Sequence, residues 1–159
     1  MIRRRVFLML CWLATGIASG PIAAADTGDG RLAIRGYDPV AYFTESRPMA
    51  GDPKHQYEWE GAVYRFASAR HLALFKANPD RYAPQYGNFC TAALSRGKRV
   101  VSDPHNWLIR DGRLHLFGKP IGPGLMQKDP KGIAARAEKN WKRVSELPWE
   151  PSAPAAQTR

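Results

Sequence analysis

The stretch Trp107-Leu108-Ile109-Arg110-Asp111-Gly112-Arg113-Leu114-His115-Leu116-Phe117 does most to decide the fold. Two short, largely apolar runs flank the pair Asp111-Gly112. An Asp-Gly pair in this setting is one of the strongest local signals of a tight β-hairpin, because both turn residues must take a positive φ. The stretch therefore predicts strands over 107–110 and 113–117, joined by a two-residue turn.

A second hairpin is predicted earlier in the chain. Gln56 to Trp59 and Ala62 to Phe66 flank Glu60-Gly61, and their aromatic residues recur with the period of two that is typical of strands. Ser68 is a suitable N-cap for a helix that follows, and Asn78-Pro79 would end that helix.

The remaining segments predict short elements and one longer helix. Residues 32–34 read as a short strand, 91–95 as a short helix, and the Gly/Pro-rich segment 118–130 as an irregular loop. Apolar residues recur at helical spacing over 131–146, which predicts an amphipathic helix. We find no internal repeat in the sequence. The predicted fold class is α+β, a single small domain with β-hairpins, short helices and a C-terminal amphipathic helix.

The composition is that of one ordinary globular domain. The chain has 159 residues, 44% of them hydrophobic, which suits one well-packed domain rather than two. Its formal net charge is +10, but the basic residues are dispersed rather than clustered. We therefore expect no nucleic-acid partner, and an envelope protein or an anionic membrane surface is the expected partner.

The N-terminus has the pattern of a signal peptide over residues 1–25. Arg3-Arg4-Arg5 precedes a short apolar run from Val6 to Ala14, and Ala23-Ala24-Ala25 offers small residues for cleavage. The apolar run is shorter than the roughly 20 residues that a membrane-spanning helix needs. We expect a periplasmic or secreted protein after cleavage near Ala25. At the other end, the Pro/Ala-rich residues 148–159 predict a disordered tail.

Cleavage would remove Cys11 and leave Cys90 as the remaining cysteine. Two interpretations of this thiol stay open. A cysteine at the start of the predicted helix over 91–95 would gain thiolate character, and a thiolate is a nucleophile and a soft-metal ligand. Free cysteine is also among the most buried residue types, so Cys90 equally fits a core position.

Several motifs in order carry a resemblance to a known family: Gly36-Tyr37-Asp38-Pro39-Val40-Ala41-Tyr42-Phe43, Tyr64-Arg65-Phe66-Ala67-Ser68, Asn78-Pro79-Asp80-Arg81-Tyr82, Pro84-Gln85-Tyr86-Gly87-Asn88-Phe89-Cys90, and Asp103-Pro104 with Trp107. Over roughly residues 32–117 the chain resembles the YHS domain, and more narrowly the exported bacterial YHS-domain proteins, some of which carry selenocysteine. The resemblance implies a compact α+β domain, with a loop and helix over 118–147 packed on it. The matched motif residues are Tyr37, Asp38, Pro39, Tyr64, Phe66, Ser68, Tyr82, Tyr86, Gly87, Asp103, Pro104 and Trp107.

The resemblance implies soft-metal or redox chemistry only in part. YHS domains attached to metal-transporting ATPases are thought to bind soft metals through cysteines, and Ala41, Ala67 and His71 stand at those cysteine positions here. That cysteine site is therefore largely absent. Cys90 remains, at the position where exported relatives show a Gly-Tyr-Cys-like triplet.

A metal site at Cys90 would need further ligands. Thiolate, imidazole and thioether groups suit Cu(I) or Zn, although no spacing in the sequence demands either ion. His71 is the preferred second ligand, because it occupies a cysteine position of the metal-binding branch. The other candidates are His105, His115 and Met49.

Two main functional hypotheses follow. The first is an exported binding module, rather than an enzyme, that uses Cys90 to bind copper or another soft metal or to carry out thiol redox chemistry. The alternative is a structural or interaction domain of the cell envelope, in which Cys90 is a core residue and the aromatic surface or the basic helix binds a partner. A third, a thiol peroxidase-like or reductase-like enzyme, would need an acid/base or electrostatic partner within reach of Cys90. We predict no catalytic residues, because no Ser/His/Asp order, phosphate loop or carboxylate pair stands out.

Overall fold

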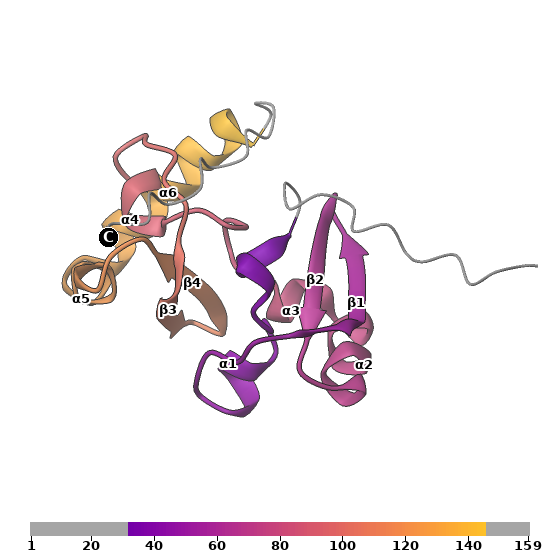
Figure 1. The fold of residues 1–159 in the computed structure, drawn as a ribbon. Helices are drawn as coiled ribbons and strands as arrows, with labels where there is room; N and C mark the ends of the chain where they lie inside the picture. Colours follow the sequence, from indigo (N-terminus) through magenta and orange to yellow (C-terminus); the bar gives the residue numbers. More distant parts are fainter. Residues whose placement is uncertain (1–31, 146–159) are drawn as a thin grey trace, which may run out of the picture.

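The computed structural model describes residues 32–145 as two lobes that lie side by side (Figure 1). The predicted signal peptide and the predicted tail lie outside these residues. The first lobe, residues 32–82, contains η2 (Ala33–Gly36), α1 (Ala41–Thr44), β1 (Asp52–Trp59), β2 (Ala62–Phe66), α2 (Ala69–Ala77) and α3 (Pro79–Tyr82). The second lobe, residues 83–145, contains α4 (Thr91–Leu94), β3 (Asp103–Arg110), β4 (Arg113–Phe117), α5 (Ile121–Lys128) and α6 (Pro130–Val144). The α+β prediction is confirmed, with one antiparallel two-stranded sheet in each lobe.

Both predicted hairpins are present. Their turns have positive φ at both residues, 47° and 72° at Glu60-Gly61 and 50° and 72° at Asp111-Gly112. β1 and β3 each begin four residues before the predicted start, because an irregularity in register separates their first pair from the regular ladder. The break interrupts the alternation on which the sequence prediction depends.

The two lobes repeat one structure. Asp52 pairs with Phe66 in the first hairpin, and Asp103 pairs with Phe117 in the second, each residue 51 positions later. The match continues to the helix caps. The side chain of Asn78 accepts a hydrogen bond from the backbone N–H three residues further along the chain. The side chain of Asp129, 51 positions after Asn78, does the same. The expectation of no internal repeat is therefore wrong. Only six positions are identical between 52–82 and 103–133, which hides the repeat in the sequence.

The repeat extends to the segment before each hairpin, with a spacing of 52 between Asp38 and Cys90 and of 51 between their hydrogen-bond partners, Met49 and Val100. Asp38 donates its backbone N–H to the carbonyl oxygen of Met49 at 2.9 Å, and Cys90 donates to Val100 at 2.8 Å. A helix of four residues follows in each lobe: α1 begins three positions after Asp38, and α4 begins directly after Cys90. Asp38 and Cys90 are thus equivalent in this backbone hydrogen bond.

Two predicted segments differ from the structure. The loop expected over 118–130 contains the helix α5, since Pro123 lies in its first turn, where no N–H is needed, and Met126 is buried. The strand expected over 32–34 is instead a 3-10 turn, in which Ile34 and Arg35 have positive φ. Only Leu32 forms a bridge, to Val63.

Contacts across the lobes hold them together. Asn88 accepts a hydrogen bond from the backbone N–H of Ile34 and donates one to the carbonyl oxygen of Leu32. The hydroxyl of Tyr42 donates to the carbonyl oxygen of Pro104 at 2.9 Å. The cluster around Phe66 and Phe75 is shared between the lobes, because Leu114 and Leu116 of β4 are buried in it. A second cluster lies within the second lobe and contains Phe117 and Met126. A further cluster buries Ala137 and Val144 of α6 with Tyr86 and Leu94.

Glycine substitutions test the equivalence of the two hairpins. Gly61 and Gly112 have the same φ and open space around a would-be Cβ. Gly61→Ala and Gly112→Ala should therefore each lower the free energy of unfolding by a similar amount, about 1 kcal/mol, measured by urea denaturation.

Two glycines of α5 provide the controls. A Cβ at Gly122 would overlap Phe117, so Gly122→Ala should cost up to about 3 kcal/mol. Gly124 faces open space, and Gly124→Ala should stabilise the helix by about 0.5–1 kcal/mol. Clearly unequal effects at the two hairpin glycines would contradict the equivalence.

Candidate functional site

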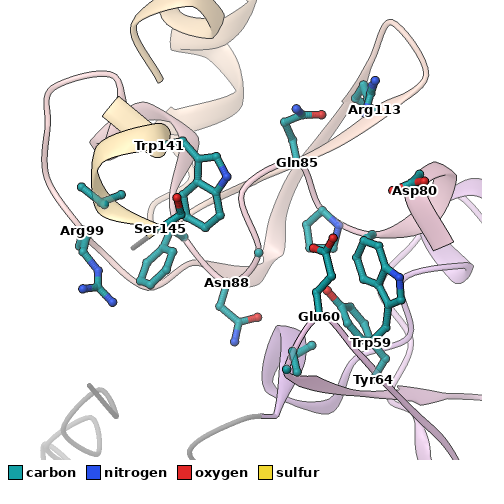
Figure 2. Close-up of a pocket in the computed structure, with 18 residues that line it drawn as sticks. Trp59, Glu60, Tyr64, Asp80, Gln85, Asn88, Arg99, Arg113, Trp141 and Ser145 are labelled. Carbon is teal, nitrogen blue, oxygen red and sulfur yellow. The ribbon is translucent and has the colours of Figure 1, made fainter. Parts of the chain in front are cut away.

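A cleft of about 510 Å³ lies between the two lobes (Figure 2). The end of the first hairpin forms one wall, from Trp59 through the Glu60-Gly61 turn to Ala62 and Tyr64. Residues of the second lobe form the facing wall and the floor: Pro84, Gln85, Gly87, Asn88, Phe89, Arg99, Arg113, Trp141, Val144 and Ser145. Ligand sites occur preferentially at such boundaries between structural units.

Two tryptophans face the cleft from opposite lobes, and other rings hold each of them in place. The rings of Trp59 and Phe75 make a T-shaped contact, with 6.0 Å between their centroids. Trp141 lies 5.9 Å from Tyr86 and 6.0 Å from Phe89. Both tryptophans are half-buried, so part of each indole stays accessible. Figure 2 shows them on opposite sides of the cleft.

Charged groups of both signs line the cleft. Glu60 and Asp80 belong to the first lobe, whereas Arg99 and Arg113 belong to the second. The guanidinium of Arg99 lies over the ring of Phe89, 4.9 Å from its centroid. The wall and rim therefore carry two carboxylates and two guanidinium groups.

The neutral polar groups of the cleft differ in whether the protein itself hydrogen-bonds them. The side chain of Asn88 is hydrogen-bonded to the backbone of Leu32 and Ile34 in the first lobe. The Oε1 atom of Gln85 is buried and has no hydrogen-bond partner among the described residues 32–145. Burial raises the pKa of Tyr64, with Glu60 adding to the shift, so its hydroxyl stays protonated at neutral pH.

Cys90 lies outside this cleft and inside a core. Its side chain belongs to an apolar cluster with Phe117, Met126 and Ile133, and only 7% of the residue is exposed. It stands at the N-cap position of α4, but its side chain makes no capping hydrogen bond. The surroundings are those of a small buried hydrophobe.

His71 is engaged by a buried carboxylate. Its Nδ1 atom lies 2.6 Å from Oδ2 of Asp38, a residue with no exposed surface. Asp38 also accepts backbone hydrogen bonds from Val40 at 2.8 Å and Ala67 at 2.7 Å. Its carboxylate therefore caps the start of α1 and fixes the orientation of the imidazole.

The structure does not bring His71 and Cys90 together. His71 belongs to α2 and Cys90 precedes α4, and these helices lie on opposite sides of the molecule (Figure 1). Within residues 32–145, no group of three or more His, Cys, Asp or Glu side chains is placed to hold a metal ion.

The other candidate ligands have separate surroundings. His105 contacts the hydroxyl of Tyr37 at 3.1 Å on the surface. His115 is buried, with its Nδ1 atom 3.4 Å from Oγ1 of Thr91, the residue after Cys90. Met49 is half-buried, and its carbonyl oxygen accepts the backbone hydrogen bond of Asp38 described above. His115 is thus the candidate histidine that contacts the helix following Cys90.

A hydroxyl extends the Asp38–His71 pair. Oγ1 of the exposed Thr44 lies 3.3 Å from Nε2 of His71, which places hydroxyl, imidazole and carboxylate in the order used for nucleophilic catalysis. The same hydroxyl is within 3.2 Å of the carbonyl oxygen of Val40. A second cavity lies elsewhere, lined by His115, Met126 and Lys131 among others. Thr44 lines neither this cavity nor the cleft, so neither of the two provides an enclosed substrate site beside it.

The family-motif residues have mainly structural positions. Ser68 caps α2 through the backbone N–H of His71, Gly87 has a positive φ, and Trp107 packs edge-on against Tyr42. Asp103 accepts a hydrogen bond from the backbone of His105. Asp38, Pro39, Tyr64, Phe66, Tyr82, Tyr86 and Pro104 are buried, and Tyr37 is half-buried.

Sequence reasoning missed the cleft because its walls come from distant parts of the chain. Trp141 belongs to the helix predicted over 131–146 and Trp59 to the first predicted hairpin, but nothing in the sequence places them at one cleft. The available signal is the residue type, because Trp combines an apolar ring with a polar N–H group and is enriched at binding surfaces.

Comparisons with protein-family models, with curated proteins and with solved structures each found no match. Among the helices within residues 32–145, none has the length and apolar character required to cross a membrane.

The buried imidazole of His115 makes stability depend on pH. Burial lowers its pKa to about 4 from an ordinary value of 6.5, only partly opposed by Asp111. The unfolded chain therefore binds a proton between these values that the folded protein does not. The free energy of unfolding should therefore be unaffected by this histidine above pH 6.5. It should fall by up to about 3 kcal/mol as the pH is lowered from 6.5 towards 4.

The measurement is urea denaturation of the wild type and His115→Gln at pH 7 and pH 4.5. His115→Gln should lose clearly less stability across this interval, because its side chain does not titrate. Equal losses in the two proteins would show that other groups cause the acid sensitivity.

Proposed function

We propose that this protein is a non-catalytic binding module that holds its ligand in the cleft between the lobes, with Cys90 serving as a core residue. The observation that carries the proposal is the cleft itself, which Trp59 and Trp141 line from separate lobes. The proposal shares with the interaction-domain alternative the core role of Cys90, but it places binding in the cleft rather than on an aromatic surface or the basic helix.

The rigidity of the two walls supports a binding role. Each tryptophan packs against further rings, which limits the side-chain entropy that binding would cost. The hydrogen bonds of Asn88 to Leu32 and Ile34 fix the position of one lobe relative to the other. A pre-formed site with aromatic walls and a few polar groups is the usual form of a small-molecule site.

The environment of Cys90 favours a structural role over metal or redox chemistry. Its neighbours are apolar, and its equivalent in the other lobe, Asp38, is a fully buried structural residue. A copper or zinc site at Cys90 would need ligands that His71 does not provide from α2. His115, next to Thr91, is the remaining histidine to test.

The resemblance to exported YHS-domain proteins is part of this proposal. Most matched motif residues lie in the core or at turns and caps, which suits motifs retained for folding. The N-terminal pattern of residues 1–25 supports export, so we place the protein in the periplasm or outside the cell. A ligand or partner of the envelope would then be available to the cleft.

A test of Cys90 separates the two hypotheses. In the native protein, Cys90 should react with a thiol reagent such as DTNB only slowly, and it should react at once in denaturant, because the side chain is buried. Cys90→Ala should lower the free energy of unfolding by about 1 kcal/mol through the cavity it leaves.

An anaerobic Cu(I) titration against a competing chelator provides the second readout. Wild type, Cys90→Ser and His115→Gln should compete equally poorly. Tight binding that both substitutions abolish would overturn the structural role of Cys90.

A thermal-shift panel tests the cleft as a binding site. The panel contains oligosaccharides, adenosine, choline and free amino acids, and at least one class should raise the Tm of the wild type by binding only the folded state. Trp141→Ala should lose that shift, whereas Trp107→Phe, outside the cleft, should keep it. A panel without any Trp141-dependent shift would contradict the proposed function.

A further inference from the structure

The geometry points to an uncharged saccharide as the ligand of the cleft, with sugar rings stacked against Trp59 and Trp141. This inference rests on the proposed function and adds the chemical class of the ligand. It follows from three features of the cleft: its balanced charges, its two tryptophans on opposite sides and the buried side-chain oxygen of Gln85.

The balance of charge excludes most other ligand classes. An anionic ligand would meet the carboxylates of Glu60 and Asp80, and a cationic one would meet Arg99 and Arg113. An apolar ligand would offer no hydrogen-bond partner to the carboxylates and guanidinium groups beside it. A neutral ligand rich in hydroxyl groups can donate to the carboxylates and accept from the guanidinium groups at the same time.

The indole faces match the other half of a sugar's surface. A pyranose ring has an apolar face of C–H groups and a rim of hydroxyls, and the apolar face packs on flat aromatic rings. Trp59 and Trp141 line the cleft from opposite sides. Phe75 packs against the first of them, and Tyr86 and Phe89 pack against the second. The hydroxyl rim would then point towards the polar groups between them.

Gln85 has an acceptor that the protein leaves unused. It lines the cleft together with Arg113, and its buried Oε1 atom has no partner within residues 32–145. An unpaired buried acceptor is destabilising. The terminal torsion of a glutamine is soft, so the amide can turn to accept a hydrogen bond from a ligand hydroxyl.

The size of the cleft favours a short oligosaccharide. Its volume of about 510 Å³ falls in the range of roughly 300–1,000 Å³ typical of sites for drug-sized ligands. Two tryptophan walls can hold more than one sugar ring, and a chain of rings can continue through the open side of the cleft.

Calorimetric titration of the purified full-length protein with cellotetraose, maltotetraose and tri-N-acetylchitotriose tests the inference, with adenosine and choline as comparison ligands. At least one oligosaccharide should bind, and Trp141→Ala should weaken it by about tenfold or more. Trp107→Phe is the matched control, because Trp107 packs against Tyr42 away from the cleft, and it should bind like the wild type.

Gln85→Leu gives a readout that a merely structural role would not produce. Removing the unpaired acceptor should raise the Tm of the free protein, while the oligosaccharide should bind about three- to tenfold more weakly. A variant that gains stability but loses affinity places Gln85 in the binding site. Unchanged affinity would remove Gln85 from the site.

The outcomes separate this inference from the proposed function. If adenosine or choline binds in a Trp141-dependent manner and no oligosaccharide does, the saccharide class is wrong and the cleft remains a binding site. If an oligosaccharide binds equally well to Trp141→Ala, its site lies elsewhere and the inference is overturned. If no member of the panel binds, both the ligand class and the proposed function are contradicted.

Discussion

The carboxylate of Asp38 is the interaction on which the first lobe depends. A fully buried carboxylate is tolerated only where hydrogen bonds replace its lost hydration. Asp38 obtains them from the start of α1, from Ala67 at the end of β2 and from His71 on α2. One side chain thus joins three elements that are separate in the sequence. The hairpin that carries Trp59 is positioned by the same contacts.

Cys90 shows how the second lobe meets the same requirement without charge. It makes the backbone hydrogen bond equivalent to that of Asp38, but its side chain packs among apolar residues. One lobe therefore uses a polar network at this point and the other uses hydrophobic packing. A lone cysteine before a short helix suggests reactivity in a sequence, whereas the apolar surroundings of Cys90 support the structural role that we propose for it.

Local signals in the sequence predicted the hairpins, since Glu60-Gly61 and Asp111-Gly112 fix the turns through backbone geometry alone. The helix α5 was missed because its Gly and Pro residues indicate a loop, while its stability comes from tertiary burial of Met126. The cleft was not predictable, because Trp59 and Trp141 come to line the same cleft only through the packing of the two lobes. The Asp38–His71 pair was hidden for the same reason, although both residues had been singled out by resemblance.

The internal repeat means that the two lobes share one backbone arrangement but differ at most side chains. The six identities between 52–82 and 103–133 are Asp, Pro, Gly, Phe, Leu and Pro, which are mainly residues of turns, strand ends and caps. Elsewhere the lobes have exchanged Phe75 for Met126 and Tyr82 for Ile133 at equivalent buried places. The residue at a given place in one lobe therefore shows one substitution that the equivalent backbone position of the other lobe can accept. The protein contains its own two-member alignment, in which retained positions report on backbone geometry and divergent ones on the separate uses of each lobe.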